Sequence, residues 1–190
     1  MHDRKLMQVY VNEEQTKSLI GNIYVGRVQN IVKNIEAAFV EIDKGLVCYL
    51  PLSDLKHPVF TNRTSGSRVN WPQKPLCIGD ELLVQVTRDA LKTKQPAVST
   101  NLSGSGEYLV LNHGEAGIGI SSKIKGAKRD RIKIFMEDLV KNPLYNEVKD
   151  FGIVLRTNTE TLEPVDFDKI STEMEHLLLS YEYMMSVATY

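Results

Sequence analysis

Residues 22–50 read NIYVGRVQNIVKNIEAAFVEIDKGLVCYL, and short turn sequences divide this stretch into three segments of strand length. Two more such segments follow after Ser53–Ile78, a long connection rich in Pro, Asn, Ser, Gly and Thr. The five expected strands are Asn22–Val32, Glu36–Ile42, Leu46–Leu50, Glu81–Arg88 and Pro96–Leu102. Three strands, a long connection and two strands are typical of a five-stranded Greek-key barrel of the OB type.

The second and third strands each have two faces, because successive residues of a strand point to opposite sides. Ala38 and Val40 point one way, whereas Phe39 points the other. In the next strand, the side chain of Tyr49 likewise points to the face opposite that of Cys48. An outward aromatic on adjacent strands is a stacking platform for unpaired bases. Such rings could equally cover the edge of the barrel or pack against a following domain.

Residues after Gly106 predict a mixed α/β region, so the whole chain is expected to have an α+β fold. Apolar side chains recur at helical spacing in two segments, and the second has Asp166 available as a cap. The expected elements are a strand at Tyr108–Asn112, a turn-rich loop at Gly114–Gly119, a helix at Lys128–Val140, a strand at Gly152–Arg156 and a helix from Asp166 onward.

Composition excludes several classes of protein. The chain is 42% hydrophobic and 25% charged, as in ordinary globular proteins. It has no apolar run of the length that spans a bilayer and no signal-peptide core, so we expect a cytoplasmic protein. Cys48 and Cys77 lack a second Cys or a His at the short offsets of metal sites. Neither a catalytic nor a metal-binding residue is predicted.

Positive charge is concentrated in the middle of the chain. Residues 123–133 contain six Lys or Arg and one acid, whereas the residues from 135 onward contain four Lys or Arg and eleven acids. Arg88 and Lys94 fall at a strand end and in a loop, where long cations could follow a phosphate backbone. A solvated charged rim explains them as well. The cations at 123–133 start a predicted helix, where the dipole disfavours them unless an anion binds or solvent screens them.

Arg156 and Thr157 directly follow the apolar run Ile153–Leu155, at an expected strand end. A guanidinium fork beside a hydroxyl suits phosphate recognition. From composition alone, a structural arginine at a strand end is the commoner explanation.

Several motifs follow one another along nearly the whole chain. They are GNIYVGRV (21–28), EAAFV (36–40), YLPL (49–52), VSTN (98–101), YLVL (108–111), GIS (119–121) with Lys123 and Ile124, and GIVLRT (152–157). In order and spacing these motifs resemble the front part of the ribonuclease E/G family of endoribonucleases. The resemblance implies three regions: a remnant strand of an RNase H-like region at 1–18, an OB-fold barrel of the S-one type at 19–101, and a small α/β 5′-sensor region at 102–190.

The resemblance also implies which residues bind RNA. By position, Phe39, Tyr49 and Lys94 match the family's contacts to single-stranded RNA, and Arg88 is added for its charge. The 5′-terminal monophosphate is expected at Arg156 and Thr157, with help from the backbone near Gly106 and Val110. Tyr49 stands where the family has Phe, a change that stacking tolerates.

For the intact enzyme, the resemblance implies RNA hydrolysis with Mg²⁺, a zinc-binding link and a homo-oligomer. The residues that bind these metals have no match in this sequence, so we expect no cofactor and no cleavage activity in this fragment. Two other functions remain open. A non-catalytic OB-fold RNA-binding protein of translation or transcription would be indifferent to the 5′ end. A protein-interaction module would bind with little dependence on salt.

Overall fold

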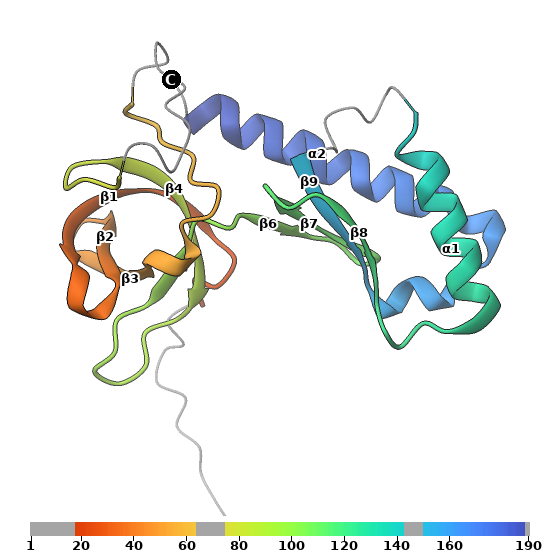
Figure 1. The fold of residues 1–190 in the computed structure, drawn as a ribbon, viewed down its shortest axis with the longest axis horizontal. Coiled ribbons are helices and arrows are strands. Elements are labelled where there is room, and N and C mark those ends of the chain that lie inside the picture. The colour runs from red at the N-terminus through yellow and green to blue at the C-terminus, as the bar shows by residue number, and fades with distance from the viewer. Residues whose placement is uncertain (1–17, 64–74, 143–149, 189–190) are drawn as a thin grey trace, which may run out of the picture.

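The computed structural model of this chain describes residues 18–63, 75–142 and 150–188. The chain forms a closed barrel and, beside it, a second sheet with two helices (Figure 1). The α+β class and the barrel followed by an α/β region, both predicted from the sequence, are confirmed. The predicted strand within residues 1–18 lies outside the described residues, except for Ser18, which is not in a strand.

The barrel has five strands, with the neighbour order β1-β2-β3-β5-β4. Its strands are β1 (Ile23–Val32), β2 (Ala37–Asp43), β3 (Leu46–Pro51), β4 (Glu81–Arg88) and β5 (Ala97–Ser99). All pairs are antiparallel except β3 with β5, and β1 closes the barrel by pairing with both β2 and β4. All five strands were predicted, with β5 shorter than expected.

The interior of the barrel is filled by the side chains that the alternation predicted to point inward. Val40, Cys48 and Leu50 have no exposed surface, and Leu82 and Val84 of β4 complete the same cluster. Burial raises the pKa of the Cys48 thiol to about 11, because the core disfavours a thiolate.

The barrel closes tightly over Gly26 of β1. A Cβ at this position would lie 2.4 Å from Cγ1 of Val40 and 3.0 Å from Cγ2 of Val84. Glycine is therefore required here by the close approach of two opposite side chains.

The long connection between β3 and β4 is fastened to the barrel at both described ends. It starts with a 3-10 turn at Leu52–Asp54, and Phe60 forms a bridge with Leu82. The Arg63 guanidinium lies 3.6 Å from the centre of the Phe60 ring, and its Nε donates to the Asp80 carboxylate at 3.1 Å. The connection was predicted as a surface loop, and its residues 64–74 lie outside the described residues.

The second sheet has the order β6-β7-β9-β8. Its elements, with the helices, are β6 (Ser103–Ser105), β7 (Leu109–His113), β8 (Gly117–Ile120), α1 (Gly126–Leu139), β9 (Phe151–Leu155) and α2 (Asp168–Ala188). The 3-10 turns Thr157–Thr161 and Pro164–Asp166 connect β9 to α2. None of the helices in the described ranges is long and apolar enough to cross a membrane.

Two strands of this sheet differ from the sequence prediction. The prediction of a loop over Gly114–Gly119 is wrong for its last residues, because β8 begins at Gly117 and pairs in parallel with β9. The strand β6 was not predicted. Both segments are rich in Gly or Ser, which have low strand propensity, so they are strands because of pairing with distant residues.

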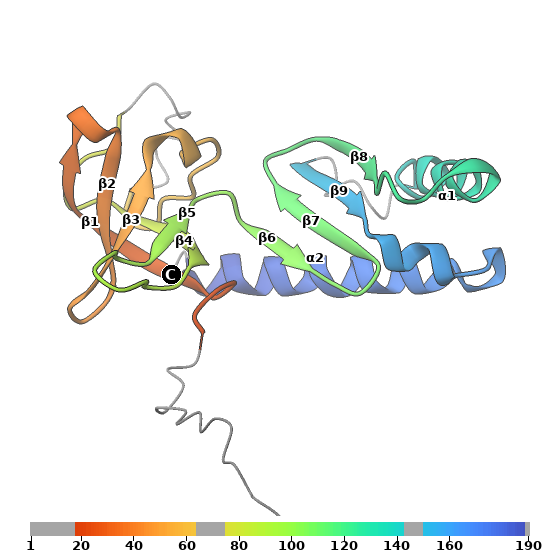
Figure 2. The ribbon, with the colours of Figure 1, turned by 90° about the horizontal axis from the view of Figure 1, so that it is seen from below.

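Both helices pack against one face of the second sheet, and α2 runs along the sheet in Figure 2. Ile132 and Met136 of α1 and Met174 of α2 share a buried cluster with Leu111 and Ile153 of the sheet. On the opposite face, Val110 and Val154 are partly exposed register partners. The second sheet therefore has one core face and one open face.

Buried Gln85 joins the barrel to the second sheet. Its Nε2 donates to the carbonyl oxygens of Gly21 at 3.0 Å and Ser103 at 2.9 Å, and its Oε1 accepts from the Ser103 amide at 2.8 Å. These three bonds satisfy the amide group of a side chain that is only 8% exposed. They tie the strand β4 to the start of β6.

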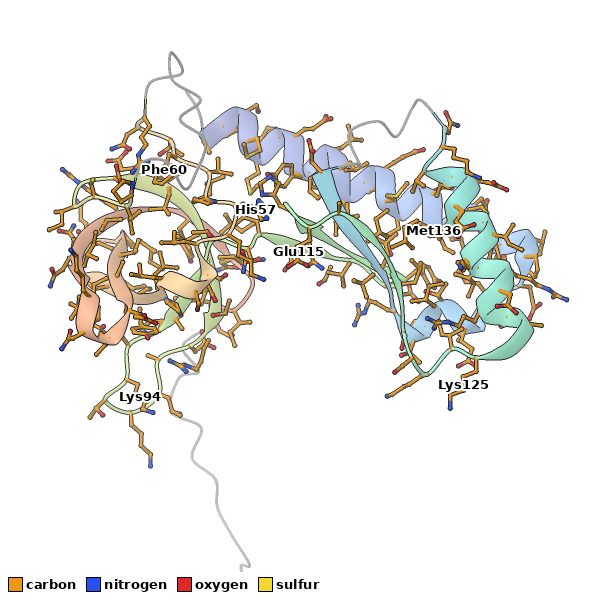
Figure 3. All side chains as sticks on the ribbon, viewed as in Figure 1. His57, Phe60, Lys94, Glu115, Lys125 and Met136 are labelled. Atoms are coloured by element: carbon orange, nitrogen blue, oxygen red, sulfur yellow. The ribbon has the colours of Figure 1, made fainter. Side chains whose placement is uncertain are left out.

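A second junction joins the barrel loop at His57 to the β7–β8 turn. Gly114 has φ of +77°, and a Cβ here would lie 2.1 Å from the His57 ring. The ring of His113 lies 6.4 Å from that of His57 and stacks on Tyr181 of α2 at 5.2 Å between ring centres. Figure 3 shows His57 and Glu115 between the barrel and the second sheet.

This junction makes the stability of the protein sensitive to acid. Burial is the main cause that lowers the pKa of His113, and repulsion from His57 lowers it further, whereas Asp150 acts in the opposite direction. Nδ1 of His113 has no hydrogen-bond partner in the described part of the chain. The unfolded state therefore binds a proton more readily, and folding stability falls as pH drops below about 6.5. We expect the melting temperature to fall from pH 7.5 to 5.5 less steeply in His113→Phe than in the natural protein.

His176→Gln, at an exposed histidine of α2, is the control and should show the same fall in melting temperature as the natural protein. If the melting temperature of His113→Phe falls as steeply as that of the natural protein, His113 is not the source of the acid sensitivity.

Candidate nucleic-acid interface

Phe39 and Tyr49 form a cross-strand pair on the outer face of the barrel. They are direct register partners in β2 and β3, and their ring centres lie 6.2 Å apart at 73° between the ring planes. Both are partly exposed, whereas Val40 and Cys48, the residues that follow and precede them, are buried inside the barrel. The sequence parity therefore assigned the two rings to the correct face.

The aromatic pair lies in a row that crosses the barrel surface. Register partners run from Asn30 of β1 to Phe39, then to Tyr49, then to Ala97 of β5, and finally to Arg88 of β4. Directly opposed residues share a face of the sheet. The row therefore connects two rings to an exposed guanidinium two strands away, across an irregularity in the register between Val86 and Arg88.

Lys94 lies in the hairpin between β4 and β5. The backbone of this hairpin turns between Leu91 and Lys94, which bond to each other in both directions, and Lys92 has φ of +54°. Figure 3 shows Lys94 at the end of this hairpin, projecting away from the barrel. With Arg88 at its base, the hairpin carries three exposed cations.

One acid also lies at the base of this hairpin. The Asp89 carboxylate accepts from the Ser18 hydroxyl at 2.6 Å and from the Leu19 amide at 2.8 Å. The hydrogen bond from Ser18 is the main reason that the pKa of Asp89 is lowered. This acid is therefore engaged by the chain that precedes β1.

Arg156 and Thr157 lie where β9 ends, and their side chains bond to different neighbours. The Arg156 guanidinium donates through Nη1 to the carbonyl oxygen of Gly106. The backbone amide of Arg156 donates to the carbonyl oxygen of Tyr108 at 2.7 Å. The Thr157 hydroxyl lies 2.9 Å from the hydroxyl of Ser121, which follows β8. The end of β9 thus carries a guanidinium and a pair of hydroxyls.

The backbone near Gly106 and Val110 is already engaged within the protein. The Gly106 amide donates to Leu109 at 2.9 Å, and Val110 pairs with Ser105 and Val154 in the sheet. The next three amides, from Glu107 to Leu109, all donate to the carboxylate of Glu173 on α2.

The basic run 123–133 lies in the β8–α1 loop and the first turns of α1. Arg129 is bonded to three carbonyl oxygens, those of Ile120, Ser121 and Ile124, and Lys128 pairs with Glu163 at 3.3 Å. Lys123 and Lys125 are exposed, and Figure 3 shows Lys125 projecting from the loop before α1. Part of the run therefore holds the loop beside Thr157 in place.

The barrel row and the end of β9 are separate surfaces. β9 starts at Phe151 near the junction with the barrel and runs away from it, so Arg156 lies at the far end of the second sheet (Figures 1 and 2). The structure does not bring Phe39 or Tyr49 together with Arg156.

Comparison with known proteins identifies the family. No protein-family model matches the chain. Ribonuclease G of Escherichia coli (strain K12) is 30% identical over 139 residues, which are 67% of this chain and 27% of the relative. Ribonuclease E of Synechocystis sp. is 32% identical over 173 residues, 89% of this chain and 23% of the relative. Putative ribonuclease E of Buchnera aphidicola is 32% identical over 152 residues, 78% of this chain and 34% of the relative.

The chain belongs to the ribonuclease E/G family. The resemblance found in the sequence motifs is thereby confirmed. The chain spans about a quarter to a third of the length of the curated relatives that it matches.

In this ribonuclease E/G-family chain, sequence reasoning missed two residues beside the predicted site. Ser121 was part of a recognised motif, but its bond to Thr157 spans 36 positions. Glu173 contacts residues 64–66 positions earlier, and no local pattern signals such a contact.

Within the described ranges, no three His, Cys, Asp or Glu side chains gather closely enough to hold a metal ion.

Proposed function

We propose that this chain is the RNA-binding portion of a ribonuclease E/G-type endoribonuclease, which processes and degrades RNA in the cytoplasm. The observation that carries the proposal is the pair of Phe39 and Tyr49, partly exposed on the outer face of an OB-type barrel in a chain of this family. Aromatic rings on this face of an OB-fold are suited to stack on unpaired bases.

Binding on the barrel would combine stacking with charge. Bases that are not paired expose their ring faces, whereas an RNA duplex hides them, so this surface favours a single strand. Arg88 and Lys94 are exposed at the base and the end of the β4–β5 hairpin, where they would neutralise phosphates. Affinity should therefore fall steeply as salt concentration rises.

The second part of the proposal is recognition of a 5′-terminal monophosphate by Arg156 and Thr157. A guanidinium and a hydroxyl at one exposed strand end can donate several charge-assisted hydrogen bonds to a phosphate. The hydroxyl of Ser121, next to that of Thr157, adds a further donor. The backbone near Gly106 and Val110 would shape the side of this site that faces β7.

Cleavage is assigned to the intact enzyme. We expect this portion to bind and orient RNA, and hydrolysis to depend on magnesium-binding residues outside it. The zinc-binding link and the homo-oligomer that the family resemblance implies also belong to the intact enzyme in this proposal.

Arg156→Ala tests the proposal through the 5′ end of the RNA. The assay is fluorescence anisotropy of a single-stranded RNA labelled at its 3′ end and carrying either a 5′-monophosphate or a 5′-hydroxyl. We expect the natural protein to prefer the monophosphate by about tenfold or more, the equivalent of one charge-assisted hydrogen bond. Arg156→Ala should abolish this preference and leave the affinity for 5′-hydroxyl RNA nearly unchanged.

Arg27→Ala is the matched control, because Arg27 is an exposed arginine of β1 far from the end of β9. It should change the affinities for both RNAs by the same factor. Equal affinities of the natural protein for the two RNAs would refute 5′ recognition and favour a plain OB-fold RNA-binding protein. Binding that is insensitive to salt would refute phosphate contacts altogether.

A further inference from the structure

A carboxylate from α2 engages the turn beside Arg156. Glu173 accepts the amide of Glu107 through Oε1 at 2.5 Å, and the amides of Tyr108 and Leu109 through Oε2 at 2.8 and 2.9 Å. Three successive N–H groups thus converge on one side chain, an arrangement that backbone nests use to bind anions. The β6–β7 turn is held by an internal anion.

The same turn holds the arginine with its carbonyl groups. The Gly106 oxygen accepts from the Arg156 guanidinium, and the Tyr108 oxygen accepts from the Arg156 amide at 2.7 Å and from the Thr159 hydroxyl at 2.8 Å. The N–H groups of the β6–β7 turn therefore bind the Glu173 carboxylate. Its carbonyl oxygens bind Arg156 at the end of β9 and Thr159 in the 3-10 turn that follows. A displacement of the turn would displace Arg156.

The identity of residue 106 fits this arrangement. A Cβ on Gly106 would lie 2.2 Å from Cδ of Glu173, far inside contact distance. Only glycine lets the carboxylate approach the three amides this closely. The turn sequence and the α2 glutamate are thus matched to each other, although 67 positions separate them.

The charge of Glu173 does not neutralise Arg156 directly. None of the ion pairs formed among the described residues joins the two side chains. Among these residues, the carbonyl oxygen of Gly106 is the one hydrogen-bond partner of the Arg156 side chain. The guanidinium therefore keeps further N–H groups for a ligand. Amides that donate to an anion also polarise the peptide groups of the turn, which strengthens the carbonyl oxygens as acceptors.

We propose that Glu173 is a positioning residue for the 5′-phosphate site: through the β6–β7 turn, it fixes where Arg156 presents its guanidinium. This inference rests on the proposed function, because it assigns a role within the same site. It predicts that loss of the carboxylate lowers recognition of the 5′-phosphate and leaves the barrel surface unaffected.

The test is Glu173→Gln, which keeps the length of the side chain and replaces one acceptor oxygen by a donor. The assay is again anisotropy with RNA carrying a 5′-monophosphate or a 5′-hydroxyl. We expect the preference for the monophosphate to fall by about tenfold, and the affinity for 5′-hydroxyl RNA to stay within about twofold. Glu175→Gln removes the same charge from an exposed position of the same helix and should retain the preference.

A double-mutant cycle separates positioning from a merely structural role. If Glu173 acts through Arg156, then Glu173→Gln should add little to the loss already caused by Arg156→Ala. Additive losses would contradict the inference. Should Glu173→Gln fail to fold, Gly106→Ala, which forces the carboxylate away from the turn, is expected to lower the preference in the same way.

These variants distinguish failure of the positioning role from failure of the proposed function. If Arg156→Ala abolishes the preference and Glu173→Gln or Gly106→Ala leaves it intact, the positioning role is wrong and the proposed function stands. If the natural protein shows no preference between the two RNAs, the proposed 5′ recognition is wrong, and the positioning role is refuted with it.

Discussion

Replacing both Phe39 and Tyr49 by alanine should weaken the binding of single-stranded RNA by about 2–6 kcal/mol, because each base stacked on an aromatic ring contributes about 1–3 kcal/mol. In terms of affinity, this is a loss of about 30-fold to more than 10⁴-fold. The two rings are register partners on the outer face of the barrel and contact each other edge to face. They can therefore receive consecutive bases of one strand.

The measurement is anisotropy of a labelled single-stranded RNA at fixed salt, with each variant checked for folding by circular dichroism. Tyr183→Ala is the control, since Tyr183 is an aromatic that is 73% exposed on α2 and does not belong to the row. It should bind as the natural protein does. Phe39→Trp should retain most of the affinity, because tryptophan also stacks. An unchanged affinity of the double alanine variant would remove the aromatic pair from the interface.

Leu50→Ala should lower the free energy of unfolding of the barrel by about 2–5 kcal/mol. Leu50 has no exposed surface and belongs to the cluster formed by Val40, Val84 and their neighbours. The loss combines a reduced hydrophobic transfer energy with the cavity that the smaller side chain leaves. The register of β3 with β2 places Tyr49 on the other face, so the aromatic pair is not altered directly.

Urea unfolding, followed by circular dichroism, measures this loss. Ile134→Ala is the matched control, because Ile134 is an aliphatic side chain that is 61% exposed on α1, and it should change stability by less than about 0.5 kcal/mol. The barrel and the second sheet have separate buried clusters. An equal, small effect of both substitutions would mean that Leu50 is not in the core.

The number and order of the strands were sufficient to predict the barrel from sequence, and alternation predicted which side chains face inward. Each strand has an inward set of residues such as Val40 and Leu50, and Asn and Gly mark the turns, so local rules agree with the closed structure. The same alternation predicted the outward faces of Phe39 and Tyr49. The strands β6 and β8 could not be predicted, because Gly104, Gly117 and Gly119 become strand residues only by pairing with distant segments.

The candidate site at the end of β9 was predictable only in part. Arg156 and Thr157 stood out because an apolar strand precedes them. Their partners Gly106 and Ser121 lie 50 and 36 positions away, and Glu173 reaches the turn from a helix. Such contacts depend on how the helix and sheet pack, which no local pattern encodes.

Crosslinking tests most directly the claim that the outer aromatic pair binds a single RNA strand. A single-stranded RNA that contains 4-thiouridine is irradiated with the protein, and the crosslinked peptides are identified by mass spectrometry. We expect crosslinks to the strands that carry Phe39 and Tyr49, and we expect excess unlabelled single strand, but not duplex RNA, to suppress them. Crosslinks that avoid β2 and β3, or that duplex RNA suppresses equally well, would contradict this claim.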